Sequence, residues 1–146
     1  MAKQTAGDST EQCNAELHML TELSKQIGHE LKPRPVDLPD GHAPRVDGVC
    51  DSPFVLCEAW AHQGRPKGAQ PKKVMADALK LLYIERVLDR PARKILLFSD
   101  SDAAAPFLGD GWQAHALRTF DVEVHVVDID PDVAESVRAA QDRQHR

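Results

Sequence analysis

The sequence predicts an α/β fold with a central mixed sheet flanked by helices, and two patterns support this prediction. Residues 45–50 and 54–60 have the composition of short strands, and the turn residues Asp51-Ser52-Pro53 between them indicate a hairpin. Farther on, apolar runs at 94–99 and 122–127 are separated by a helical segment, which implies a parallel crossover. An antiparallel hairpin next to a parallel crossover makes the sheet mixed.

The helices are predicted from apolar spacing and from end signals. Ser9 and Gln12 form a capping box at the start of a first helix, whose apolar stripe is Leu17, Leu20, Leu23, Ile27 and Leu31. Residues 32–41 are rich in proline and turn residues, so we expect an irregular connection there. A second helix runs to about Leu88, with Val74, Ala78, Leu81 and Leu82 on its apolar face. Further helices are expected through Trp112, Leu117 and Phe120 and from Pro131 onward.

Length and composition predict one domain over residues 9–146, with residues 1–8 as a disordered lead-in. No apolar run is long enough to span a bilayer, and the first residues lack a hydrophobic signal segment, so the expected location is the cytoplasm. Three cysteines without a CxxC pair argue against a disulfide framework and a structural zinc site. We interpret Cys13, Cys50 and Cys57 as buried thiols.

The net charge of −5 gives no overall attraction to nucleic acid, so phosphate binding would need a local basic patch. Five bases against the single acid Asp77 occur between residues 65 and 80. The candidate nucleic-acid-binding residues are therefore Arg65, Lys67, Lys72, Lys73 and Lys80. A second basic stretch at the end of the chain is interpreted as a solvated helix.

Two acids lie on the strands of the predicted hairpin. Asp47 is near the end of one strand and Glu58 is on the other, so antiparallel pairing brings their carboxylates to one place. Carboxylate oxygens, with water and phosphate completing the shell, are the ligands that Mg²⁺ prefers. The sequence thus predicts a Mg²⁺ or Mn²⁺ site on Asp47 and Glu58, with a nearby lysine to stabilise charge on a phosphodiester.

The helix, the strand Val46-Asp47-Gly48-Val49, the strand 55–60, the next helix and the next strand together resemble the core of the PD-(D/E)xK nuclease-like superfamily, which has the restriction-endonuclease-like fold. Some uncharacterised bacterial proteins of this type are similar from Ala61 onward. The resemblance covers roughly residues 9–100. It implies an αββαβαβ core, metal ligation by both acids and hydrolysis of nucleic-acid phosphodiester bonds.

The resemblance also implies further site residues. The family has a lysine two residues after the second acid, but this sequence has Trp60 there. Some members take the lysine from the following helix, so Lys73, ahead of Lys67, is the expected replacement. Gln70 would face the site from the same helix. Glu16 would match the acid that the family often has on its first helix.

Each candidate also has a simpler explanation. Asp47-Gly48 has the composition of a hairpin turn. Lys73 suits a solvated helix face on which it pairs with Asp77. His62 is a candidate ligand or proton carrier, although a histidine in a loop is usually neither. An acid in an apolar strand costs free energy unless it is paired or ligated, which makes Glu58 the hardest to explain as structural.

Two other functions stay open at this stage. The strand 94–99 ends in Asp100-Ser101-Asp102, which with Glu58 resembles the metal-binding acids of the Toprim fold, a metal-dependent phosphotransfer domain. Helix capping is the simpler explanation of Asp100 and Asp102. The second alternative is a catalytically degenerate nuclease-fold module that binds a protein or nucleic acid. The expected partners are nucleic acid, DNA first, and a homodimer or partner protein, but no membrane.

Overall fold

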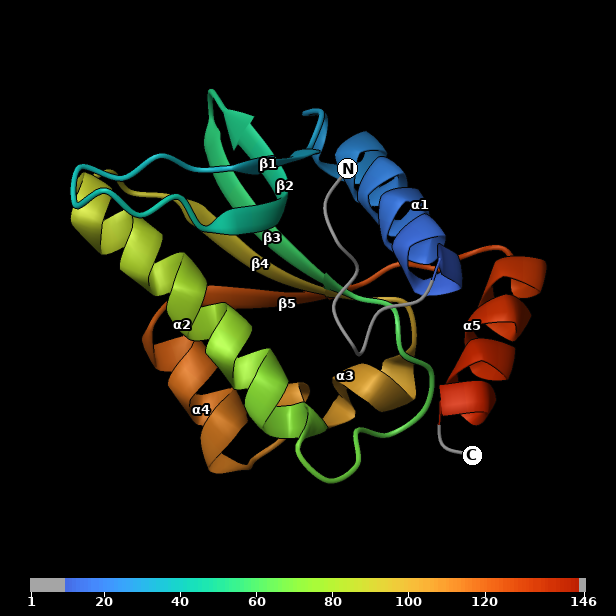
Figure 1. Cartoon of the computed structure of the whole chain (residues 1–146). Coiled ribbons are helices and arrows are strands. Elements are labelled where there is room, and N and C mark those ends of the chain that lie inside the picture. Colours follow the sequence, from blue (N-terminus) through green and yellow to red (C-terminus); the bar gives the residue numbers. More distant parts are fainter. Residues whose placement is uncertain (1–9, 145–146) are drawn as a thin grey trace.

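The computed structural model describes residues 10–144, so the predicted lead-in and the Ser9 cap lie outside the described part. A five-stranded sheet has the order β1-β2-β3-β4-β5 (Figure 1). The pairs β1–β2 and β2–β3 are antiparallel, and the pairs β3–β4 and β4–β5 are parallel. The predicted α/β class and mixed sheet are confirmed. The strands are β1 (Lys32–Pro35), β2 (Arg45–Asp51), β3 (Phe54–Trp60), β4 (Arg93–Phe98) and β5 (Val122–Val126).

Helices cover both faces of the sheet in three layers (Figure 1). One face packs on α1 (Thr10–Ile27) and α5 (Pro131–Gln144), which contact each other. The other face packs on α2 (Gln70–Leu88), α3 (Ser101–Leu108) and α4 (Trp112–Thr119). Side chains of β3 alternate between the two cores: Leu56 and Trp60 face α2, whereas Val55 and Cys57 face α1. The Glu58 side chain therefore belongs to the α2 face.

The prolines at residues 33 and 35 do not prevent strand formation. Residues 32–35, predicted as irregular, form β1, which pairs with β2 through Lys32↔Val49 and Arg34↔Val46 with a register shift between them. Because β1 is at the edge of the sheet, proline can be accommodated in it where its missing N–H would have faced outward. The predicted irregular connection is thus wrong over this segment.

The buried face of α1 differs from the predicted stripe. Leu17 is 52% exposed, and the face that packs on the sheet is Gln12, Ala15, Met19, Leu20 and Leu23. Leu31 is buried but lies beyond the end of the helix. The helix predicted through Trp112 and Phe120 is preceded by the separate α3, and both aromatic side chains are mostly exposed.

Other sequence predictions are confirmed. The turn at residues 51–53 joins β2 and β3, α2 ends at Leu88 with Asp89 in the left-handed conformation, and α5 begins at Pro131. The three cysteines, all within the described residues, form no disulfide, but only Cys57 is fully buried and the other two are half-buried. None of the helices in residues 10–144 has both the length and the apolar character needed to cross a bilayer.

Candidate active site

Asp47 and Glu58 lie next to the point where the backbone pairing of β2 with β3 ends. Gly48↔Cys57 is the last backbone pair of this ladder, so the next position places Asp47 across from Glu58. Asp47 Oδ2 then accepts a hydrogen bond of 2.9 Å from the Ala59 main-chain N–H. A carboxylate thus takes the role of a backbone acceptor and is held beside β3.

Gly48 is required by the neighbouring helix rather than by a turn. It lies inside β2, so the interpretation of Asp47-Gly48 as a hairpin turn is wrong. A Cβ atom at this position would be 2.7 Å from Leu20 Cδ2 and 3.2 Å from Leu31 Cβ. The absent side chain lets α1 approach the strand closely, which fixes the path of the chain next to Asp47.

The base beside these acids is Lys80 of α2. Its Nζ lies 2.5 Å from Glu58 Oε1 and donates a 2.9 Å hydrogen bond to the Arg45 carbonyl oxygen. Glu58 is 5% exposed, whereas the Lys80 side chain is 30% exposed. Lys80 also lines a surface groove with Pro44, Ala76, Leu79 and Tyr83. The Lys80 ammonium therefore lies between the buried Glu58 carboxyl group and solvent.

The electrostatics of the cluster are dominated by burial. Burial raises the pKa of Glu58 to about 10, and the negative charge and hydrogen bonding of Asp47 raise it further than Lys80 lowers it. At neutral pH the Glu58 carboxyl group is therefore protonated. The acids Glu58, Asp77 and Asp47 raise the pKa of Lys80 against the effect of its own burial.

One polar atom of β3 on this face, the indole Nε1 of Trp60, is buried without an acceptor among the described residues. A buried unsatisfied donor costs about 1–3 kcal/mol. Glu58 Oε1 lies 2.5 Å from Lys80 Nζ, so the ammonium already occupies this oxygen.

The other predicted site residues lie elsewhere. Lys73 is exposed about two turns before Lys80, a rise of roughly 10 Å along the helix. Gln70 Oε1 accepts a hydrogen bond of 2.9 Å from the Lys67 main-chain N–H and so holds the loop before α2. Glu16 is half-buried on α1, across the sheet from the Glu58 side chain.

His62 follows β3 and stacks on Trp60, with ring centroids 4.5 Å apart. Its Nε2 lies 3.2 Å from Gln12 Nε2, so it connects the end of β3 to α1. Of the predicted nucleic-acid-binding residues, Arg65, Lys67, Lys72 and Lys73 are exposed, and only Lys80 reaches the acids. The sequence pattern identified Lys80 only as a phosphate-binding candidate and did not indicate that its turn of α2 lies over Glu58.

The Toprim-like acids do not form a cluster with Glu58. Asp100 is the N-cap of α3 and accepts a hydrogen bond from the Asp102 main-chain N–H, which confirms the capping explanation. Within residues 10–144, no three His, Cys, Asp or Glu side chains are placed to hold a metal ion together.

No family model, no curated protein and no solved structure matches the chain.

Proposed function

We propose that the chain is a metal-dependent hydrolase of nucleic-acid phosphodiester bonds with a restriction-endonuclease-like fold. Asp47 and Glu58 are the proposed ligands of Mg²⁺ or Mn²⁺, and Lys80 takes the role first expected of Lys73. The observation that carries this proposal is the meeting of two carboxyl groups and one ammonium at a single point of the sheet.

The donor set fits a hard divalent cation. Mg²⁺ commonly binds one or two carboxylates and keeps water or substrate phosphate as its other ligands. The two carboxyl groups lie close enough for their charges to oppose each other, and a cation would remove this repulsion. These features support ligation by the two acids.

Other residues of the chain would neutralise charge on the substrate and bind its phosphates. The ion, when bound, would polarise a phosphodiester oxygen as a Lewis acid. Lys80, on the solvent side of Glu58, is placed to neutralise charge that develops on the phosphate. The exposed bases Arg65, Lys67, Lys72 and Lys73 before and along α2 would hold neighbouring phosphates. β3 has Trp60 at the position where the family has a lysine, and Lys80 of α2 would supply the ammonium group instead.

The arrangement of the strands supports the proposed fold. The two strands that carry the acids are antiparallel neighbours, and α2 then connects β3 to the parallel strand β4. The order of helix, acid-bearing strands, helix and strand on which the resemblance to the nuclease-like superfamily rests is present, with β1 as an additional strand between α1 and β2.

A catalytically degenerate module that binds nucleic acid or protein is the second candidate. It is favoured by the contact of 2.5 Å between Lys80 and Glu58, which already places a positive charge where an ion would act. The small exposed fraction of Glu58 points the same way. In this case the acids and Lys80 would stabilise the sheet, and the basic residues would be the functional ones.

A cleavage assay separates the two candidates. Purified wild-type chain, Glu58→Gln and Asp47→Asn are incubated with a mixture of DNA and RNA, with Mg²⁺, with Mn²⁺ and with chelator. We expect metal-dependent cleavage by the wild type and none by either variant. Glu123→Gln, which changes an acid of the same sheet outside the cluster, is the matched control and should cleave normally. Nucleic-acid binding without cleavage by the wild type would establish the degenerate module.

A further inference from the structure

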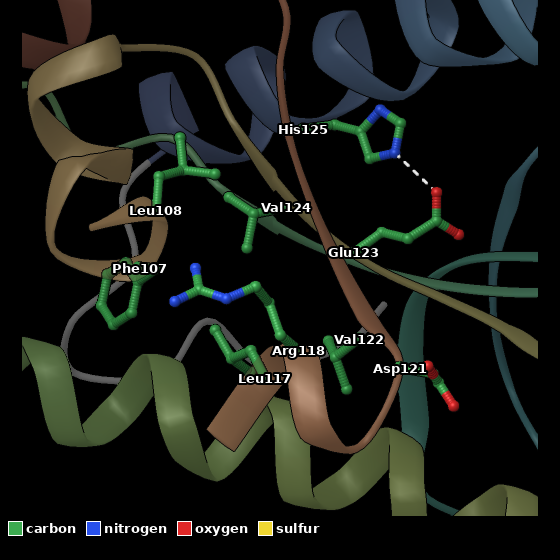
Figure 2. Close-up of a pocket in the computed structure, with 9 residues that line it drawn as sticks. All are labelled: Phe107, Leu108, Leu117, Arg118, Asp121, Val122, Glu123, Val124 and His125. Atoms are coloured by element: carbon green, nitrogen blue, oxygen red, sulfur yellow. Dashed lines mark hydrogen bonds and ion pairs between the residues drawn. The ribbon is translucent and has the colours of Figure 1, made fainter. Parts of the chain in front are cut away.

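Among residues 10–144, no strand pairs with the outer edge of β5. This strand pairs with β4 on its other side. A groove of about 560 Å³ runs along it, lined by Phe107 and Leu108 of α3, Leu117 and Arg118 of α4, and residues 121–125. Figure 2 shows Val122 and Val124 on the side of α3 and α4, and Glu123 and His125 on the opposite side of the strand. An open strand edge beside an apolar groove can accept another strand.

The direction of the main-chain groups follows from one hydrogen bond. The Val127 N–H donates to the Phe98 carbonyl oxygen, at 2.9 Å, so residue 127 faces β4. In a strand, successive residues present their main-chain groups to opposite sides, and in a parallel ladder the N–H and C=O of one residue point the same way. Residues 123 and 125 therefore also bond toward β4. The N–H and C=O groups of Val122, Val124 and Val126 point outward.

The residues of β5 show the same pattern of chemical types in both directions along the strand. Read from either end, Val122-Glu123-Val124-His125-Val126 gives apolar, ionisable, apolar, ionisable, apolar, with an acid opposite a base. An antiparallel copy centred on Val124 would set Val124 against Val124 and Val122 against Val126. These are the residues whose main-chain groups point outward, so each pair can exchange two hydrogen bonds.

The same register places Glu123 opposite His125 of the second copy. These would be the non-hydrogen-bonded pairs, in which facing side chains are closest. Within one chain Glu123 already binds His125, at 3.0 Å, and Arg93, at 2.8 Å. Two copies would therefore join two acids and four bases in one network. A register shifted by one residue would lose both the outward hydrogen bonds and the charge match.

We propose that β5 pairs antiparallel with β5 of a second copy of the chain about a twofold axis at Val124, which joins the two sheets into one. Val126 of one copy would cover Val122 of the other beside the groove, where Leu108 is now 53% exposed. The interface is isologous, since each chain gives the same strand. It is short, so the association is weak and depends on concentration. The pairing does not depend on the proposed nuclease function.

Sedimentation velocity on the full chain over a wide concentration range tests the pairing. The wild type should shift from the mass of one chain to twice that mass as concentration rises. Val126→Pro removes an outward N–H but none that β4 uses, so it should stay monomeric with an unchanged circular dichroism spectrum and melting temperature. Leu17→Ser, an exposed apolar position on α1, is the control and should dimerise like the wild type.

A charge exchange tests the register independently of any effect of proline on folding. His125→Glu alone sets acids against acids, and Glu123→His alone sets bases against bases, so each variant should be monomeric. A mixture of the two, near or below the ordinary pKa of histidine, restores both opposite-charge pairs and should form a heterodimer. The proposal is overturned by a wild type that is monomeric throughout, by a Val126→Pro variant that dimerises normally, or by a mixture that stays monomeric.

Discussion

Two glutamates of the same sheet lie beside bases, yet their pKa values shift in opposite directions. Burial, and then Asp47, raise the pKa of Glu58 to about 10 although Lys80 is in contact with it. The hydrogen bonds from Arg93 lower the pKa of Glu123, with a smaller contribution from His125 and against the effect of burial. Glu58 is 5% exposed and the Glu123 side chain 38%.

The difference shows that neighbouring bases lower the pKa of a partly exposed acid, whereas a single base does not lower the pKa of an acid in the core. Glu123 is partly solvated, so the hydrogen bonds from Arg93 outweigh its smaller desolvation cost. Glu58 is desolvated and lies beside a second acid, and a single ammonium does not offset both effects. The burial of Glu58 therefore lowers the free energy of unfolding, and such a cost is typical of residues that are kept for function. The following predictions test this contrast, from the largest effect to the smallest.

Replacement of Lys80 by methionine should have the largest effect on cleavage. The variant keeps the apolar stem but loses the charge beside Glu58, and loss of one group that stabilises transition-state charge costs roughly a hundredfold in rate. Lys73→Met, on the same helix but two turns away, should change the rate only slightly through weaker phosphate binding. Initial cleavage rates on a common substrate measure both variants, and a larger loss in Lys73→Met would move the lysine role to that residue.

The stability of the wild type should fall with rising pH relative to Glu58→Gln. The pKa of Glu58 is above its unfolded value of about 4.5, so its contribution to stability is fully present below that pH and is lost as the pH rises toward 10. Between about pH 5 and about pH 8, the free energy of unfolding of the wild type should drop by about 1 kcal/mol per pH unit relative to the variant.

Urea unfolding at several pH values measures this difference, with Glu123→Gln as the control. The pKa of Glu123 is lowered, so its contribution is lost only as the pH falls through the folded-state value. The difference in free energy of unfolding between Glu123→Gln and the wild type should therefore stay constant over the same pH range. A constant difference for Glu58→Gln as well would mean that Glu58 is ionised at neutral pH and that Lys80 alone compensates it.

Gly48→Ala should destabilise the chain by about 1–3 kcal/mol, because its Cβ would meet Leu20 and Leu31 at less than van der Waals distance. The displaced strand would also move Asp47 away from Glu58. Gly109→Ala is a matched control, since its Cβ would have only one neighbour, the Ala105 carbonyl oxygen at 3.6 Å. Thermal melts compare the two, and equal melting temperatures would show that α1 can move without cost.

Glu123→Gln should change stability by less than about 1 kcal/mol, since exposed ion pairs contribute little. It should leave cleavage unchanged. Unfolding in urea at dilute concentration, where self-association is negligible, gives the value. A loss of several kcal/mol would show that the edge cluster is as critical to the fold as the buried one.

Local patterns were sufficient to predict the elements that carry the site. The apolar run of β4, the strand composition of β2 and β3, and the stripe on α2 all reflect burial against nearby layers, and their bounds agree with the structure to within a few residues. The pair Asp47 and Glu58 also follows from sequence, because a hairpin fixes which residues oppose each other.

The remaining errors concern contacts between segments that are distant along the chain. Which turn of α2 lies over Glu58 depends on the path of the loop between β3 and α2, so Lys73 and Lys80 could not be distinguished by spacing. β1 forms because β2 offers it an edge, although its own prolines predict a turn. Leu17 follows helical spacing but lies where no layer covers α1.

The most direct test of the account is a calorimetric titration of Mn²⁺ into the wild type and Glu58→Gln, repeated in two buffers of different ionisation enthalpy. Because Glu58 carries a proton before an ion can bind, the wild type should bind Mn²⁺ with release of a proton, and the variant should show neither signal. No binding by the wild type, or equal binding by the variant, would contradict the metal site and leave the acids with a structural role.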